Sequence, residues 1–455
     1  MKQITVGDIV AAVKGTLLCG DANQQIEHIC IDSRVSQGND IFIPIIGEKV
    51  DAHRFIAQAL GNGCVATLTS EHTEASGEKA WIRVEDTIEA LHDIGRLCRS
   101  RVTIPAVGVT GSVGKTTTRE MIATALSAQK RIYKTGKNYN SSVGLPITLS
   151  EMSNDYDMAV LELGMNVPGE LGTISRIAQI SMAVVTNIGV AHMEFYGSRE
   201  KLCEEKLTIT TGLQEGGTVF LNGDDPLLMQ YRDTVPFPVL TYGTGAQCDY
   251  RADDIHMEEG HYCFTLVHGA TRQPVKLSVL GIHNIGNACA ALAVADQCGV
   301  DLDAAAAALY AFTGFANRLE RFEKDGLLVI DDTYNASPDS MKAGLDVLAG
   351  MENTGRKIAV LGDMFELGSE SPVYHYQVGT HAATLQIDEM VLVGTLAKEI
   401  GRAMKEAGSV CPIQYFAERA DAAKYLKETA KQGDVIYIKA SNGMKLKEIT
   451  AELMK

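Results

Sequence analysis

The sequence has few of the features that mark secreted, membrane-spanning or disulfide-stabilised proteins. No run in its 455 residues approaches the roughly 18 consecutive apolar residues that a membrane-spanning helix needs. The opening MKQITVGDIVAAVKG lacks the long apolar core of a signal peptide. The ten cysteines are scattered and no two form a C-x-x-C pair, so we expect neither a disulfide framework nor a zinc site. These absences favour a cytoplasmic protein with reduced thiols and no membrane insertion.

Positive charge is also scarce in this chain. Lys and Arg number 41 against 57 Asp and Glu, which gives a formal net charge of −16. Such a balance argues against nucleic acid and anionic lipid as general partners. A single anionic ligand is still compatible with it, because a few cations and backbone N–H groups can be concentrated in one cleft.

The length predicts three domains at about 150 residues per domain. Residues 1–84 mix short strands and helices and predict a small α/β domain. Residues 85–313 alternate buried strands with helices, as in a parallel sheet, with a β-rich antiparallel excursion at 250–280. In residues 314–455, apolar strands at 327–330, 357–361, 390–393 and 435–438 each end in a polar or glycine-bearing loop. The last pattern predicts a doubly wound, Rossmann-like sheet whose ligands lie beyond the carboxyl ends of its strands.

The strongest chemical signal is the string GVTGSVGKTTT at residues 108–118, between an expected strand and an expected helix. A glycine loop at this place lets backbone N–H groups surround a phosphate, with Lys115 reaching the β- and γ-phosphates and the Thr116 hydroxyl binding Mg²⁺. Val109 stands where the general P-loop pattern has its first glycine. A plain glycine-rich turn is the alternative, but the string favours an ATP-binding protein. The residues expected to contact the nucleotide here are Gly111, Ser112, Val113, Gly114, Lys115, Thr116 and Thr117.

Three further residues could complete a metal site. Glu162 ends one buried strand, His192 follows another strand in TNIGVAH, and Lys206 lies in an expected helix. Taken alone, each has an ordinary alternative: a solvated or capping carboxylate, a satisfied imidazole and an exposed helix lysine.

Five strings occur in the order in which they stand in one enzyme family. They are TGSVGKTTT (110–118), LELG (161–164), TNIGVAH (186–192), GIHNIGNA (281–288) and NRLE (317–320). On these strings the chain resembles the Mur ligases, the ATP-dependent amide ligases of peptidoglycan precursor synthesis, over essentially its whole length. The resemblance implies three domains that bind a UDP-precursor (1–84), ATP (85–313) and the incoming amine (314–455), with the third closing over ATP.

Further strings resemble one branch of the family. DDTYNASP (331–338) and LGDMFELG (361–368) are similar to those of members that add D-alanyl-D-alanine, and IDSR (31–34) and GEKVDAH (47–53) are similar to those in their UDP-precursor domain. This resemblance implies ADP-forming addition of D-Ala-D-Ala to UDP-N-acetylmuramoyl-tripeptide through an acyl phosphate.

The resemblance also implies roles for particular residues around ATP. Lys115 and Thr116 would hold the phosphates and a first Mg²⁺ with Glu162, while His192 and a carbamylated Lys206 would serve a second Mg²⁺. Asn284 and Asn287 would face the adenine, Arg318 a phosphate and Asp332 the ribose. From the residues alone, helix capping for the two asparagines, a surface ion pair for Arg318 and a turn at Asp331-Asp332 remain alternatives.

The remaining candidates concern the two other substrates. Those on the UDP-sugar side are Ser33 and Arg34, for which an ordinary turn is the alternative. Asn138 and Asn140 lie in a string that matches the family except at Ser141. Tyr334, Asn335, Asp363 and Glu366 are expected on the dipeptide side, with Lys439 and Ser441 in a late loop where Asn442 replaces the family's usual arginine and its bidentate fork.

Three alternatives stay open at this point. The chain could be a sister Mur ligase, a ligase similar to folylpolyglutamate synthetase, or a non-catalytic paralogue that binds nucleotide. We expect small-molecule substrates only and a monomer. The sequence leaves open whether the tripeptide ends in lysine or diaminopimelate.

Overall fold

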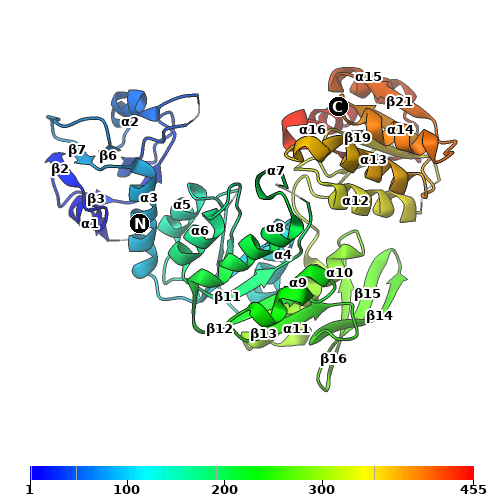
Figure 1. Cartoon of the computed structure of the whole chain (residues 1–455), viewed down its shortest axis with the longest axis horizontal. Coiled ribbons are helices and arrows are strands. Elements are labelled where there is room, and N and C mark those ends of the chain that lie inside the picture. Colours follow the sequence, from blue (N-terminus) through cyan, green and yellow to red (C-terminus); the bar gives the residue numbers. More distant parts are fainter. Residues whose placement is uncertain (2, 48, 137, 191–192, 353) are drawn as a thin grey trace. The chain divides into compact units, whose positions relative to one another are not determined.

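The computed structural model describes residues 1–455 except residues 2, 48, 137, 191–192 and 353 (Figure 1). The chain forms two compact units. The first unit comprises Met1–Thr110, Lys130–Val184 and Glu205–Val219, and the second comprises Gly111–Gln129, Val185–Glu204 and Phe220–Lys455. No helix in the described part of the chain is long and apolar enough to cross a membrane. The predicted domain boundaries near residues 84 and 313 stay predictions.

The N-terminal part of the first unit contains a five-stranded sheet with the order β2-β7-β6-β5-β4. The strands are β2 (Thr16–Cys19), β4 (His28–Cys30), β5 (Asp40–Phe42), β6 (Ala66–Thr69) and β7 (Ala80–Arg83). Strands β4 to β7 pair in parallel, and β2 pairs antiparallel to β7. A separate antiparallel pair joins β1 (Ile4–Thr5) to β3 (Gln25–Ile26).

Local sequence signals explain the helices of this part. Helix α1 (Val6–Ala12) begins with a capping box between Thr5 and Asp8, and α2 (Ile56–Gly61) packs its apolar side chains against Phe42. Helix α3 (Thr87–Ser100) starts where the Asp86 carboxylate accepts hydrogen bonds from two backbone N–H groups.

A nine-stranded sheet follows, with the order β16-β15-β14-β13-β12-β11-β8-β10-β9. Its strands are β8 (Ala106–Thr110), β9 (Ile132–Lys134), β10 (Met158–Glu162), β11 (Ile180–Val185), β12 (Leu213–Asn222), β13 (Val239–Gly243), β14 (Tyr250–Glu258), β15 (His261–His268) and β16 (Thr271–Leu277). Strands β8, β10 and β9 pair in parallel. Strands β14, β15 and β16 pair antiparallel, which confirms the expected excursion. The parallel register places Glu162, the last residue of β10, beside Val109 of β8.

Helices connect these central strands. They are α4 (Lys115–Ser127), α5 (Gly144–Glu151), α6 (Glu170–Ala178), α7 (Met193–Tyr196), α8 (Arg199–Leu207), α9 (Pro226–Tyr231), α10 (His283–Gln297) and α11 (Leu302–Ala311). Within the second unit, α4 packs against α10 and α11. Ala288, Cys289, Ala291 and Ala295 of α10 are buried, and such small side chains allow the close approach of two helices.

The C-terminal part of the second unit is a six-stranded sheet with the order β17-β18-β22-β19-β20-β21. The strands are β17 (Glu320–Lys324), β18 (Leu327–Asp331), β19 (Lys357–Gly362), β20 (Glu389–Val393), β21 (Ile413–Phe416) and β22 (Val435–Lys439). All pairs are parallel except that of β17 with β18.

Helices cover both faces of this sheet, as Figure 1 shows in yellow to red. They are α12 (Pro338–Gly350), α13 (Ser371–Ala382), α14 (Lys398–Glu406), α15 (Arg419–Thr429) and α16 (Lys447–Leu453). Successive strand residues alternate between two apolar cores: Ile330 and Leu361 belong to one, and Val329 and Val360 to the other. The predicted doubly wound α/β sheet is therefore confirmed.

Candidate nucleotide and substrate site

The glycine loop (residues 111–114) between β8 and α4 has a backbone that only glycine adopts easily. Gly111 and Gly114 have φ angles of +148° and +85°, and a Cβ atom at Gly111 would clash with the Thr186 hydroxyl. Gly114 is the N-cap of α4 and no side chain caps that helix. The start of a helix that no side chain caps is a place where anions bind to backbone N–H groups.

Two residues that follow β11 fasten the glycine loop. The carbonyl of Asn187 accepts a hydrogen bond from the Ser112 N–H (3.0 Å). Its side chain accepts from the Val113 N–H and donates to the Val113 carbonyl, each at 2.9 Å. The Thr186 hydroxyl also donates to that carbonyl (2.6 Å). Because Asn187 occupies the N–H groups of Ser112 and Val113, the N–H groups left for a phosphate are those at the start of α4.

Polar side chains in and beside the glycine loop lie near the start of α4. Lys115 Nζ donates to the carbonyls of Gly111 (2.8 Å) and Ser112 (3.3 Å). The buried Thr116 hydroxyl accepts from Arg318 Nη2 (3.0 Å). Ser112 Oγ is buried and has no hydrogen-bond partner among the described residues. Such an arrangement fits a ligand with several anionic oxygens better than a closed structural turn.

Asn284 and Asn287 belong to a hydrogen-bond chain that ties α10 to α4. The Thr118 hydroxyl donates to Asn287 Oδ1 (2.9 Å), Asn287 Nδ2 donates to Asn284 Oδ1 (2.8 Å), and Asn284 Nδ2 donates to the Leu280 carbonyl (2.6 Å). The two asparagines therefore hold the helix that carries Thr116 at a fixed distance from α10.

Arg318 lies at a sharply bent segment of the chain. Its neighbours Asn317 and Leu319 have φ angles of +56° and +51°, and its guanidinium carbon is 4.3 Å from the centre of the Tyr334 ring. Within the described residues Arg318 makes no ion pair, and its buried Nε has no partner. The alternative of a surface salt bridge therefore does not describe this residue.

The predicted ribose residue, Asp332, forms a polar triad with the buried side chains of Lys439 and Tyr437. Asp332 Oδ2 accepts from Lys439 Nζ (2.6 Å) and from the Tyr437 hydroxyl (2.9 Å). Burial lowers the pKa of Lys439 although Asp332 opposes this shift, and burial together with Asp332 raises the pKa of Tyr437. Asp331 is different, because its Oδ1 accepts from Thr333 N (3.0 Å) and Oγ1 (2.6 Å) in a local turn.

The loop that follows β22 is hydrogen-bonded to the loop that follows β19. Ser441 Oγ accepts from the Phe365 N–H (2.9 Å), and the carboxylate of Asp363 accepts from the N–H groups of Thr395 (3.1 Å) and Ala397 (2.8 Å). Asp363 therefore contacts backbone on both oxygens. Glu366, with a φ of +63°, is exposed at the tip of the same loop, and Asn335 is exposed after Tyr334.

In the first unit, Glu162 and Asn140 contact each other. Asn140 Nδ2 donates to Glu162 Oε1 (2.8 Å), and the Glu162 N–H donates to Thr135 Oγ1 (3.0 Å). Glu162 is only 4% exposed, so the alternative of a solvated strand-end carboxylate is wrong. Asn138 lies exposed in the same loop, and Ser141 Oγ accepts from the Gly144 N–H at the start of α5 (3.3 Å).

Lys206 is buried, contrary to what its helical sequence alone suggests. Its side chain belongs to the first unit, is 1% exposed, and places Nζ 3.9 Å from Met165 Sδ. Lysine is almost never buried to this extent unless it is paired.

Ser33 and Arg34 differ in accessibility. Ser33 is buried, donates from its hydroxyl to Gln58 Oε1 (3.1 Å) and accepts from Asn62 at its carbonyl (2.8 Å). Arg34 is exposed and pairs with Asp32 (2.7 Å). Hydrogen bonds from Arg34 lower the pKa of Asp32 to about 2.

Comparison with known proteins identifies the family. The model of the Mur ligase middle domain matches residues 109–295, and that of the Mur ligase glutamate ligase domain matches residues 317–442. The UDP-N-acetylmuramoyl-tripeptide--D-alanyl-D-alanine ligase of Bacillus subtilis is 38% identical to this chain over 458 residues, covering 100% of this chain and 99% of the relative. The chain belongs to the Mur ligase family.

Solved structures of this family match the fold of the whole chain. MurF of Acinetobacter baumannii is 31% identical with a TM-score of 0.90, and the match covers 99% of this chain and 98% of that one. MurF ligase of Thermotoga maritima in complex with ADP is 28% identical with a TM-score of 0.83, covering 94% and 97%. The three-domain Mur ligase architecture expected from the sequence is thereby confirmed.

The predicted residues of this Mur ligase fall into two groups. The second unit holds the glycine loop, Thr117, Asn284, Asn287, Arg318, Asp332, Tyr334, Asn335, Asp363, Lys439 and Ser441; the first holds Ser33, Arg34, Asn138, Asn140, Glu162 and Lys206. The predicted metal ligands are divided, with Thr116 in the second unit and Glu162 and Lys206 in the first. His192 lies outside the described residues.

Several side chains that support the site of this Mur ligase are not among the predicted site residues. Thr118, Thr135 and Tyr437 hold predicted residues directly, and His375 accepts a hydrogen bond from the Met364 N–H at Nε2 (2.9 Å), inside the loop after β19. Burial lowers the pKa of His375. Each is separated in sequence from the residue that it supports, so only the fold brings the pair together.

Proposed function

We propose that this Mur ligase joins D-alanyl-D-alanine to UDP-N-acetylmuramoyl-tripeptide with hydrolysis of ATP to ADP and phosphate. The observation that carries the proposal is 38% identity over the full length to a ligase of that name. The glycine loop with Lys115 and Thr116, and the buried Glu162, supply the side chains that such chemistry needs. They also argue against a paralogue that only binds nucleotide.

The reaction proceeds in two steps whose atoms balance. A terminal carboxylate oxygen of the tripeptide attacks the γ-phosphorus of ATP, the bond to the β-phosphate oxygen breaks, and ADP leaves. The amine of D-Ala-D-Ala then attacks the acyl carbon to form a tetrahedral intermediate. Phosphate leaves with the former carboxylate oxygen, and the amine proton passes to solvent or to a base. Both steps require positioning and charge neutralisation more than covalent help from the protein.

We assign the glycine loop to the ATP phosphates. The first-turn N–H groups of α4, Lys115 Nζ and the Arg318 guanidinium would surround the β- and γ-phosphates, and Ser112 Oγ offers a further hydrogen bond. Thr116 and Glu162 would bind Mg²⁺, which neutralises charge on the transferred phosphoryl group. Asn140 would orient the Glu162 carboxylate. Thr117, Asn284 and Asn287 would line the nucleoside side, and Asp332, held by Lys439 and Tyr437, would face the ribose.

We further propose that Lys206 is carbamylated and serves a second Mg²⁺ with His192. Addition of CO₂ to the uncharged amine gives a carbamate anion and releases a proton. The conversion would turn a buried cation into a ligand suited to a divalent metal.

We assign the other two substrates to two further groups of residues. Ser33 and Arg34 with residues 1–84 would bind the UDP-sugar, with Arg34 exchanging Asp32 for a diphosphate oxygen, and Asn138 would contact the same precursor. Tyr334, Asn335, the loop carrying Asp363 and Glu366, and Ser441 would bind the dipeptide. Since both oxygens of Asp363 contact backbone N–H groups, we assign Asp363 to shaping that loop.

Residues 314–455 would close over residues 85–313 and keep water from the acyl phosphate. We also propose that the protein acts as a monomer in the cytoplasm.

Omission of one substrate at a time tests the proposal. Phosphate release from ATP should require both UDP-N-acetylmuramoyl-tripeptide and D-Ala-D-Ala. A single amino acid in place of the dipeptide should give no comparable rate, and neither should a folate in place of the precursor. Comparable rates with a single amino acid would favour a sister Mur ligase, and absence of release with the full set would favour a non-catalytic protein.

A further inference from the structure

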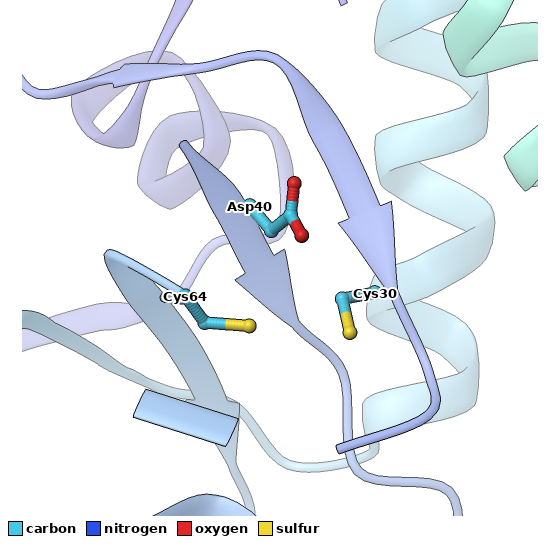
Figure 2. Close-up of side chains that lie close together, drawn as sticks. All are labelled: Cys30, Asp40 and Cys64. Carbon is cyan, nitrogen blue, oxygen red and sulfur yellow. The ribbon is translucent and has the colours of Figure 1, made fainter. Parts of the chain in front are cut away.

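Two cysteines and an aspartate meet inside the N-terminal sheet, away from the residues assigned above. Cys30 ends β4, Asp40 begins the neighbouring β5, and Cys64 precedes β6. Figure 2 shows the two thiols and the carboxylate at the corners of a triangle between these strands. One ligand atom from each lies within 4.8 Å of the other two. The residues are 5%, 1% and 0% exposed, so the cluster is internal.

The Asp40 carboxylate is incompletely satisfied. Its Oδ2 accepts from Ser36 Oγ (2.8 Å) and from the Gln37 N–H (2.7 Å). Its Oδ1 is buried and has no hydrogen-bond partner among the described residues, and Asp40 makes no ion pair within that part of the chain. A buried carboxylate without a cation is costly, which indicates that a positive charge belongs beside Oδ1.

We propose that Cys30, Asp40 and Cys64 bind a thiophilic divalent cation, for which Zn²⁺ is the appropriate probe. Two thiolates and one carboxylate are ligands that zinc prefers. On binding, both thiols release their protons to solvent, so the three anionic groups are offset by two positive charges. The expectation of no zinc site rested on the lack of a C-x-x-C pair, a local pattern that says nothing about ligands from three separate elements.

The geometry requires only a small contraction. Zinc–sulfur and zinc–oxygen bonds of about 2.3 and 2.0 Å place tetrahedral ligand atoms roughly 3.5 Å apart. No two ligand atoms, which now lie within 4.8 Å of each other, would therefore have to approach by more than about 1.3 Å. Cys30 Sγ lies 3.0 Å from the Val35 carbonyl oxygen and 3.1 Å from that of Asp32, so an oxygen for the fourth position is close by.

The site would stabilise the loop that carries Ser33 and Arg34. This loop connects β4 to β5, with Cys30 at its start, Asp40 at its end, and Ser36 and Gln37 bound to the Asp40 carboxylate. A metal that joins both ends would hold the loop in one conformation. If the proposed function holds, removal of the metal should raise KM for the UDP-precursor and leave KM for ATP unchanged.

Metal titration of the full chain tests the site without reference to activity. The protein is stripped with a chelator, kept reduced with a phosphine, and titrated with Co²⁺ in the absence of nucleotide. One equivalent of Co²⁺ should produce thiolate-to-cobalt charge-transfer absorption, which Zn²⁺ then abolishes by displacement. Zn²⁺ should also raise Tm, because it binds only the folded chain. A cation at the ATP site gives no thiolate absorption, so the two sites are distinguished.

Matched variants identify the ligands. Cys64→Ser and Asp40→Asn should each weaken Zn²⁺ binding by at least about 10-fold, whereas Cys98→Ala, at another buried thiol of the same unit, should bind as the wild type does. The amide oxygen in Asp40→Asn can still accept from Ser36 and Gln37, which preserves the fold if Cys64→Ser does not. Lack of thiolate absorption in the wild type, or wild-type affinity in Asp40→Asn, would overturn the proposal.

Discussion

Gly111 is the residue at which the glycine loop depends most on the absence of a side chain. Its φ angle of +148° and its proximity to the Thr186 hydroxyl leave no room for a Cβ atom. Gly111→Ala should therefore displace the loop, and strain of about 1–3 kcal/mol should weaken ATP binding about 10-fold or more. Titration with a fluorescent ATP analogue measures the effect.

Gly77→Ala is the matched control, because Gly77 also has a positive φ (+125°) but open space around its Cβ position. It should lower stability by about 1 kcal/mol or less and leave nucleotide affinity unchanged. Equal ATP affinity in the Gly111 and Gly77 variants would show that the loop does not bind the nucleotide.

Lys206 provides the second prediction at this scale. If its carbamate binds a metal ion, Lys206→Ala should lower kcat by at least about 100-fold. The wild type incubated with ¹³C-bicarbonate should show a carbamate carbon signal that Lys206→Ala and Lys206→Arg lack. Full activity in Lys206→Ala would contradict the carbamate assignment, and activity lost without any carbamate signal would leave lysine itself as the functional group.

The role of a residue could be predicted from the sequence only where a short local motif indicates it. The string around Lys115 and Thr116 predicted a glycine loop followed by a helix, and both are present. The burial of Lys206 was not predictable from CEEKL, because exposure depends on what packs against the helix. Asp331 is bonded within a local turn, whereas Asp332 is bonded to Lys439. This difference could not be predicted either, because it depends on the distant strand β22.

At the scale of elements, the amino ends of the C-terminal strands are joined by one buried ion network. The Arg356 guanidinium pairs with Asp434 (2.7 Å) before β22 and with Glu389 (2.8 Å) at the start of β20. Burial alone would raise the pKa of Asp434, but hydrogen bonds from Arg356 and Lys431 outweigh it, and the pKa lies below its ordinary value of 3.8.

Asp434→Asn tests this network through its pH dependence. At pH 7 the substitution should lower the free energy of unfolding by about 2 kcal/mol, since it removes charge-assisted hydrogen bonds between the half-buried Arg356 and a buried carboxylate. A carboxyl with a lowered folded-state pKa stabilises the protein above its ordinary pKa and loses this contribution as the pH falls through the folded-state value. The difference between variant and wild type should therefore shrink below about pH 3.8.

Urea unfolding followed by circular dichroism measures the effect. The single tryptophan, Trp81, lies in the first unit, so its fluorescence transition should stay unchanged and serve as an internal control. A difference that persists undiminished at acid pH would contradict the assignment.

Elements with continuous apolar strands were predictable, and those with mixed sequences were not. Strands β18, β19, β20 and β22 are buried on both faces, so their hydrophobic runs indicated them directly. Strands β17 and β21, at the two edges of that sheet, alternate charged or polar residues with apolar ones and were not among the predicted strands. Edge strands bury one face only, which weakens the signal in a sequence.

The C-terminal sheet has its own core, which allows a test at the scale of the whole molecule. Two apolar clusters cover its faces, and both consist of residues beyond 318 apart from Val190 and Leu280, which pack against one of them. A fragment comprising residues 314–455 should therefore fold alone, with one cooperative urea transition and a dispersed NMR spectrum. It should not bind ATP, because the glycine loop is absent. A disordered fragment would contradict the predicted boundary near residue 313.

The net charge of −16 describes the whole molecule and not its proposed substrate sites. It argues against general affinity for polyanions, yet two of the proposed substrates, ATP and the UDP-precursor, are anions. In the proposed function the compensation is local, through Lys115, Arg318, the start of α4 and the proposed metal ions. Composition could predict the sign of the surface but not these few positions, because they contribute little to the total.

The central claim is that a ligase reaction passes through an acyl phosphate, and oxygen transfer tests it most directly. UDP-N-acetylmuramoyl-tripeptide labelled with ¹⁸O in its terminal carboxylate is incubated with ATP, Mg²⁺, D-Ala-D-Ala and the enzyme. Mass spectrometry should find one ¹⁸O atom in the released phosphate and the matching pentapeptide product. Unlabelled phosphate, or labelled phosphate without the pentapeptide, would contradict the account.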